Sequence, residues 1–172
     1  QGRLKGGRQR AVTPIHYAQR RRRVLSAVVA SGLEGALLTT PVNVRYLTGF
    51  TGTNGWLLVT AEKVLFFTDP RYQQQAFAQV GDLSIVIAPR GLPKTLAAAV
   101  VHSGIQRVAF EPDHVTVILR EQLEAMVEVE WVSFPMLVET HRCCKDAEEI
   151  EAIRAALLVS EAAFQEVANR LV

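Results

Sequence analysis

Apolar positions along the chain alternate between short continuous runs and stripes with helical spacing. Strand-like runs stand at 35–40, 56–60, 63–69, 83–88, 107–111 and 129–134. Stretches with helical spacing or helix-start signals lie before the first run, at 14–32, and between later runs, at 69–81, 92–104 and 112–126. Strands that alternate with helices of about 10 to 15 residues are typical of an α/β domain.

The runs at 56–60 and 63–69 are separated only by Ala61 and Glu62. Two apolar runs with so short a polar break predict a β-hairpin. A hairpin pairs its strands antiparallel, so the expected sheet is mixed rather than wholly parallel.

Local signals mark where several helices begin. Thr13 precedes Pro14, and Asp69 precedes Pro70, so each pair predicts an N-cap followed by the first helical residue. Pro112 and Asp113 are expected to open a further helix with apolar residues at Val115, Ile118, Leu119, Leu123 and Met126.

Residues 49–55, "GFTGTNG", contain three glycines just before the hairpin. Phosphate-binding loops lead from a strand into a helix and often carry a Lys, whereas this segment leads into a strand and has no Lys. We therefore expect Gly49, Gly52 and Gly55 to supply unusual backbone angles in a surface loop, which could still shape a binding cleft.

The formal charge of +2 is unevenly distributed. Residues 1–23 hold 8 of the 19 basic residues and no acid, which leaves 11 basic against 17 acidic residues elsewhere. Arg20, Arg21, Arg22 and Arg23 would fan around a helix, so a solvated face is the favoured interpretation. RNA binding through this helix remains the alternative, but the acidic body argues against a nucleic-acid partner.

Residue types that build catalytic or metal centres are present but not in recognisable spacings. Cys143 and Cys144 are adjacent, which predicts unpaired thiols rather than a zinc site, even with His141 nearby. The sequence has no nucleophile elbow and no phosphate-binding loop. We expect no catalytic residue and no metal ligand in this chain.

The last segment is a long amphipathic helix. Asp146 and Glu149 form a capping-box pattern, followed by an apolar stripe at Ile150, Ile153, Leu157, Phe164, Val167 and Leu171. That stripe needs a partner, so the helix is expected to belong to a further domain.

Two expectations concern the ends and the compartment. Residues 1–12 lack apolar periodicity and are expected to form a flexible tail. No apolar run approaches the length of about 20 residues that spans a bilayer, and no signal core follows the basic start. A soluble cytoplasmic protein without a membrane partner is expected.

Three segments in order, "NVRYLTGFTGTNGWLLVT", "FTDPRYQQQA" and "HRCCKDAEEIEAIRAA", resemble the N-terminal part of the proline-specific metallopeptidases. This group contains aminopeptidase P, prolidase and creatinase, and the resemblance covers about residues 16–172. It implies a creatinase-like N-terminal domain over 13–140, with a mixed sheet, flanking helices and ribonuclease H-like topology. Residues 141–172 would then be the linker and first helix of a truncated pita-bread catalytic domain.

The resemblance also implies a function. The full-length protein would hydrolyse the peptide bond next to proline with two divalent ions, manganese or cobalt, held in the missing domain. This segment would be inactive, would support a homo-oligomer and would border the active site. The candidates for that border are Tyr46, Phe50, Asn54, Arg71 and Tyr72.

Some alternatives stay open at this point. The chain could instead be a stand-alone interaction module without a catalytic partner, in which case its last helix would pack on its own domain or between chains. The sequence also leaves open whether the parent is an aminopeptidase, a dipeptidase or a creatinase-like enzyme.

Overall fold

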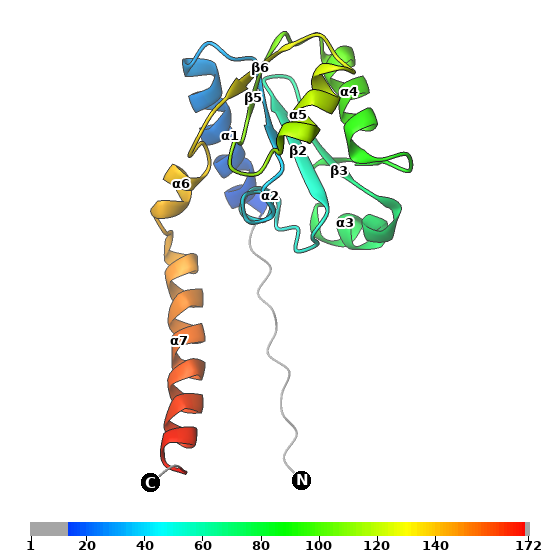
Figure 1. The fold of residues 1–172 in the computed structure, drawn as a ribbon. Coiled ribbons are helices and arrows are strands. Elements are labelled where there is room, and N and C mark those ends of the chain that lie inside the picture. Colours follow the sequence, from blue (N-terminus) through cyan, green and yellow to red (C-terminus); the bar gives the residue numbers. More distant parts are fainter. Residues whose placement is uncertain (1–13, 171–172) are drawn as a thin grey trace. The chain divides into compact units, whose positions relative to one another are not determined.

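The computed structural model describes residues 14–170 and is built around one six-stranded sheet (Figure 1). The strand order is β4-β3-β2-β1-β5-β6. The strands are β1 (Gly35–Leu38), β2 (Gly55–Thr60), β3 (Val64–Thr68), β4 (Ser84–Ile87), β5 (Arg107–Phe110) and β6 (Glu130–Ser133). All six coincide with the predicted apolar runs.

Strand directions confirm the predicted hairpin and the mixed sheet. β2 and β3 pair antiparallel, with Gly55 opposite Thr68 and Trp56 opposite Phe67. β1 is antiparallel to β2 and parallel to β5. β3 with β4 and β5 with β6 complete the sheet as parallel pairs.

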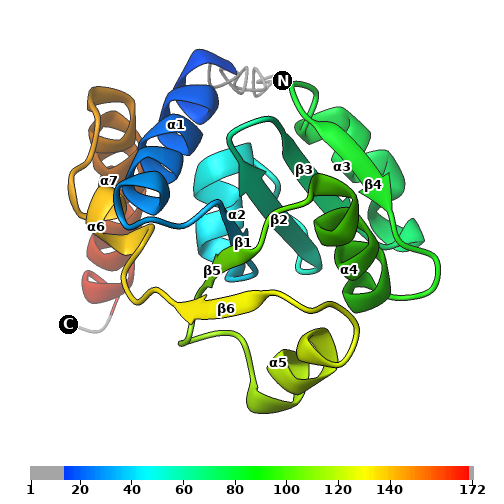
Figure 2. The same ribbon diagram turned by 90° about the horizontal axis from the view of Figure 1, so that it is seen from above.

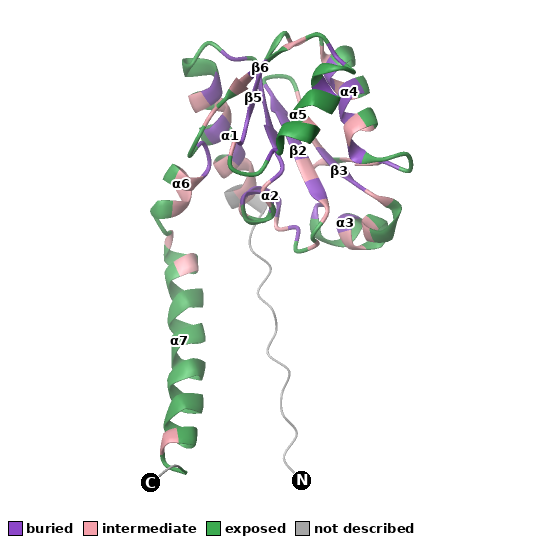
Figure 3. Ribbon diagram, viewed as in Figure 1, coloured by how far each residue is buried: buried purple, intermediate pink, exposed green. Residues whose placement is uncertain are grey.

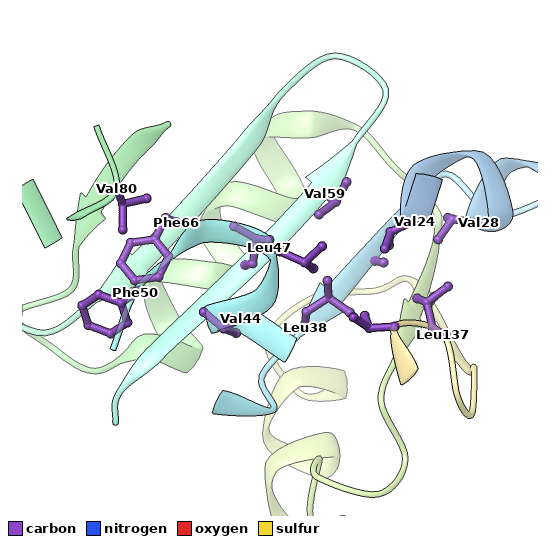
Figure 4. Packing of buried hydrophobic residues seen from close by; sticks show 14 of the residues in the cluster. Val24, Val28, Leu38, Val44, Leu47, Phe50, Val59, Phe66, Val80 and Leu137 are labelled. Atoms are coloured by element: carbon purple, nitrogen blue, oxygen red, sulfur yellow. The ribbon is translucent and has the colours of Figure 1, made fainter. Parts of the chain in front are cut away.

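Helices cover both faces of the sheet (Figure 2). One buried cluster joins the sheet to α1 (Pro14–Ala30), α2 (Pro41–Thr48) and α3 (Gln73–Gln79), and Figure 4 shows part of it. The other cluster joins the sheet to α4 (Leu92–Ser103) and α5 (Val117–Glu124). Side chains of a strand alternate between the two, because successive residues point to opposite faces. In β1, for example, Leu38 belongs to the first cluster and Leu37 to the second.

Most helices begin where the sequence predicts. Asp69 caps the short 3-10 helix η1 (Pro70–Tyr72), which runs directly into α3. α1 is present as predicted, although its expected cap, Thr13, lies outside the described residues.

The predicted start of α5 is wrong. Pro112 and Asp113 lie in a turn that the backbone N–H of Val115 closes on the carbonyl of Glu111 at 3.0 Å. The helix begins only at Val117, because Thr116 is extended and its Oγ1 accepts from the backbone N–H of Leu119. As a result Leu123 of the expected apolar stripe is buried, whereas Ile118 and Met126 are exposed.

Helix α2 was not predicted. Its sequence contains Pro41 and Asn43, residue types that commonly mark turns and loops. Pro41 stands at the first helical position, where its missing N–H has no cost, and Gly49 ends the helix in the left-handed region with φ of 79°.

The chain divides into two compact units, and the second begins at Glu139. It contains α6 (Glu139–Cys143) and α7 (Ala147–Ala168), and the predicted capping box of Asp146 and Glu149 is present. None of the residues of α7 is buried (Figure 3). The apolar stripe of α7 is exposed over its described part, and Leu171 lies outside that part.

No helix between residues 14 and 170 combines the length and the apolar character that crossing a bilayer requires.

Candidate functional site

Three of the predicted border residues come together around Asp69. The Nδ2 of Asn54 donates to Asp69 Oδ2 at 2.5 Å, and the guanidinium of Arg71 donates to both carboxylate oxygens at 3.0 and 2.9 Å. Asn54 precedes β2 and Asp69 follows β3, so the antiparallel register of the hairpin places them side by side. We call Asn54, Asp69, Arg71 and Tyr72 the hairpin rim.

The charges of the rim are strongly coupled. Arg71 holds the pKa of the Asp69 carboxyl well below its usual range through its side-chain hydrogen bond, and the Asn54 amide adds to this effect. Asp69 in turn raises the pKa of Arg71. The Asp69 side chain is 14% exposed and that of Arg71 is 78% exposed, so the arginine is the accessible member of the pair.

An aromatic group supports the rim. The hydroxyl of Tyr72 lies 2.7 Å from Thr53 Oγ1, and the guanidinium of Arg71 lies 5.8 Å from the centre of the Tyr72 ring. Phe50 contacts the Tyr72 and Phe66 rings edge to face. Because Phe50 is only 1% exposed, its side chain supports the rim from the core and does not line it.

The fifth candidate, Tyr46, lies on α2 in a different setting. Its ring is 4.1 Å from the guanidinium of Arg20, and Arg20 Nη1 donates to the Tyr46 carbonyl at 3.1 Å. Tyr46 therefore joins α1 to α2 and has a packing role.

The expectation of a solvated face for the four arginines is wrong for Arg21. Its side chain is buried, donates to the carbonyl of Leu47 at 2.8 Å and forms an ion pair with Asp82. Arg22 and Arg23 are exposed. Arg21 points inward because its place on α1 faces α2 and the segment before β4, which a count of charges along the sequence does not reveal.

The predicted reason for the three glycines is correct only for Gly49. Gly52 and Gly55 do not have positive φ. A Cβ on Gly52 would lie 2.7 Å from Phe50 Cε1, and one on Gly55 would lie 2.8 Å from Phe66 Cζ. These two positions are small because buried aromatic rings press against the backbone.

Glu111 is a buried polar residue that the sequence interpretation did not single out. Its carboxylate accepts from the backbone N–H of Thr39 at 2.6 Å, from that of Thr40 at 2.8 Å and from Nδ2 of Asn43 at 2.6 Å. It thus joins the end of β5 to the start of α2. The sequence offered one signal for this buried carboxylate, namely an acidic residue directly after a buried strand.

Metal ligands are not gathered within the described residues. No group of three or more His, Cys, Asp or Glu side chains there could hold an ion. His114 Nδ1 lies 3.0 Å from Thr39 Oγ1, whereas Cys143 and Cys144 are exposed and form no disulfide.

Comparison with known proteins identifies the family to which this fold belongs. The model of the creatinase/prolidase N-terminal domain matches residues 20–144, which is most of the chain. The chain belongs to the creatinase/prolidase N-terminal domain family. This confirms the resemblance seen in the sequence and the expected fold class.

Several relatives of this creatinase/prolidase N-terminal domain have known structures. An Xaa-Pro dipeptidase from Bacillus anthracis is 31% identical, with a TM-score of 0.85 over 89% of this chain and 43% of that chain. The N-terminal domain of the cytoplasmic peptidase PepQ from Mycobacterium tuberculosis H37Rv is 35% identical, with a TM-score of 0.67 over 71% of this chain and 97% of that chain.

The uncharacterized peptidase YqhT of Bacillus subtilis (strain 168) is 35% identical over 137 residues, which are 79% of this chain and 39% of YqhT. The chain therefore spans less than half the length of this relative and of the Bacillus anthracis dipeptidase.

Proposed function

We propose that this chain is the non-catalytic N-terminal domain of an Xaa-Pro peptidase, which as a whole hydrolyses the peptide bond next to proline. The observation that supports this is the family match over residues 20–144, together with relatives that are more than twice as long and are described as Xaa-Pro peptidases. Its first partner would be its own C-terminal catalytic domain.

The chemistry would reside in that domain. Two divalent ions, manganese or cobalt, would polarise the scissile carbonyl and activate a water molecule there. No group of three or more candidate metal ligands lies within the described residues. We propose that this domain contributes binding surface. We further propose a cytoplasmic homo-oligomer, in line with the cytoplasmic description of the Mycobacterium tuberculosis relative.

The hairpin rim is the surface best suited to border the active site. Arg71 is exposed and is oriented by Asp69, while Tyr72 presents a hydroxyl beside it. The two bonds to Asp69 use Nε and Nη2 of Arg71, so Nη1 can donate to a carbonyl or carboxylate oxygen of a peptide. Phe50 would support this border from the core, whereas Tyr46 lies apart from it on α2.

The first test uses the purified 172-residue chain with Xaa-Pro dipeptides and longer Xaa-Pro peptides in the presence of Mn²⁺ or Co²⁺. We expect no release of the N-terminal residue. Metal-dependent release that follows this chain through purification would contradict the proposal.

A second test concerns the rim in a full-length protein that carries this domain. Arg71→Lys keeps the charge but loses the two-point contact with Asp69, so KM for an Xaa-Pro peptide should rise several-fold with little change in kcat. Arg23→Lys, at an exposed position on α1, is the matched control and should leave KM unchanged. Equal KM values for both variants would exclude Arg71 from the border.

A further inference from the structure

Strand β4 leaves one side of its backbone without a partner strand among the described residues. It is an edge strand, bonded to β3 alone (Figure 2). The N–H of Ala88 donates to the carbonyl of Thr68 at 2.8 Å, so Ala88 and, by alternation, Val86 face β3. The N–H and C=O groups of Ile85 and Ile87 therefore point away from the sheet.

This edge lacks the features that usually prevent strands from pairing. Exposed edges commonly carry Lys, Pro or a bulge. The residues of β4 are Ser-Ile-Val-Ile, without charge or proline, and its three apolar side chains are half-buried. At the opposite edge, by contrast, β6 carries Glu130, which forms an ion pair with Arg107 at 2.7 Å.

Neighbouring surface adds apolar area next to the edge. Phe77 lies on α3, which packs beside β4, and its side chain is 57% exposed. An aromatic ring of this size is more often buried in a core or an interface. Phe77 therefore adds exposed apolar area on a helix that contacts β4.

We propose that β4 pairs antiparallel with β4 of a second copy of this chain, around a two-fold axis at Val86. In this register Ile85 faces Ile87 of the other copy, and both residues direct their backbone groups outward, which gives about four hydrogen bonds between the chains. A register shifted toward the C-terminus would place Ile85 opposite Pro89, which has no N–H to donate.

Charge also favours this register. It places Asp82, before the strand, beside Arg90 of the other copy, after it. Arg90 is exposed and forms no ion pair among the described residues. Asp82 accepts from Arg21 through Oδ2, so its Oδ1 remains for a second cation. The two-fold axis gives two such pairs, one on each side of the apolar centre. A strand of another protein would need the same arrangement of charges to compete for the β4 edge.

The proposal specifies a surface for the homo-oligomer proposed above, and its test does not depend on peptidase activity. Sedimentation velocity of the 172-residue chain over a range of concentrations should show a reversible dimer. Hydrogen exchange should show that the amides of Ile85 and Ile87 become protected as the dimer forms, because they would be bonded only there.

Two variants test the surface directly. Ile87→Lys adds a charge to the edge, and Arg90→Asp sets an acid beside Asp82 of the other copy. Each should weaken dimerisation about tenfold or more. Val101→Lys on α4 and Leu157→Lys on α7 change exposed apolar residues elsewhere and should leave the dimer intact.

Several results would overturn the proposal. These are a wild-type chain that stays monomeric at about 100 µM, a dimer whose Ile85 and Ile87 amides exchange as fast as in the monomer, or a dimer lost only in Leu157→Lys. If Ile87→Lys does not fold, Arg90→Asp alone decides the outcome, since Arg90 lies in an exposed loop.

Discussion

The three glycines of residues 49–55 are required by the groups that surround them. Gly49 needs its left-handed backbone to end α2, whereas Gly52 and Gly55 leave room for the Phe50 and Phe66 rings. In a sequence, a glycine that is required by a close contact looks the same as a glycine that is required by a positive φ. Only the packing separates the two reasons.

Gly52→Ala should therefore destabilise the protein. The added methyl group would meet Phe50 and Tyr72 within 3 Å, and Phe50 is too deeply buried to move aside, so a loss of about 1 to 3 kcal/mol is expected. Gly81→Ala is the matched control, because a Cβ there meets nothing within 4 Å, and it should change stability by about 0.5 kcal/mol or less. Urea unfolding measures both, and equal losses would contradict the contact explanation.

Asp69 should make stability depend on pH in the acid range. Its pKa is lowered in the folded state, chiefly by Arg71, so the unfolded chain binds the proton more tightly. The stabilisation is complete above the ordinary Asp pKa of about 4 and is lost as the pH falls through the folded value. The unfolding free energy of the wild type should exceed that of Asp69→Asn by an amount that shrinks below about pH 4. A difference that stays constant down to about pH 3 would contradict this.

At the scale of elements, the hairpin and most helices follow from local signals. Alternation, short breaks and caps act within a few residues, so a linear pattern reveals them. Helix α2 is different. It has no side-chain cap of its own at Thr40, and the carboxylate that holds the residues just before the helix, by accepting the N–H groups of Thr39 and Thr40, comes from Glu111. A contact across 71 residues leaves no local trace.

Glu111→Gln should loosen the start of α2. The buried carboxylate accepts three hydrogen bonds. In the variant, the NH₂ group of the Gln side chain would face N–H donors that now bond to a carboxylate oxygen. About 3 kcal/mol of stability should therefore be lost. Glu34→Gln is the control, since Glu34 also accepts two backbone N–H groups but is exposed, and its loss should be smaller. Thermal unfolding of the two variants tests the difference, and an equal or larger loss for Glu34→Gln would contradict it.

At the scale of the whole molecule, stability resides in the first compact unit. Both buried clusters are formed by residues up to Val138, and α7 contains no buried residue. The isolated N-terminal domain of a Mycobacterium tuberculosis relative matches 71% of this chain, which supports an independent fold.

A chain ended after Val138 should consequently keep its fold. We expect its Tm to change by less than about 4 °C, while the helical signal in circular dichroism falls by the part that α6 and α7 contribute. Loss of cooperative unfolding in the shortened chain would show that the second unit is needed.

The hairpin rim shows the same division between local and tertiary information. The interaction of Asp69 with Arg71 lies within two residues, so it depends on local sequence alone. The approach of Asn54 depends on the strand register, and the separate position of Tyr46 depends on helix packing.

The sequence by itself determined the strands, the hairpin and hence the mixed sheet, the capping box of α7 and the family. Each of these rests on periodicity or on residues that are neighbours in the chain. Only the tertiary structure decided that Arg21 and Glu111 are buried, that Gly52 and Gly55 accommodate aromatic rings and that β4 is an unprotected edge. These features arise where segments far apart in sequence meet, so their physical cause exists only in the folded protein.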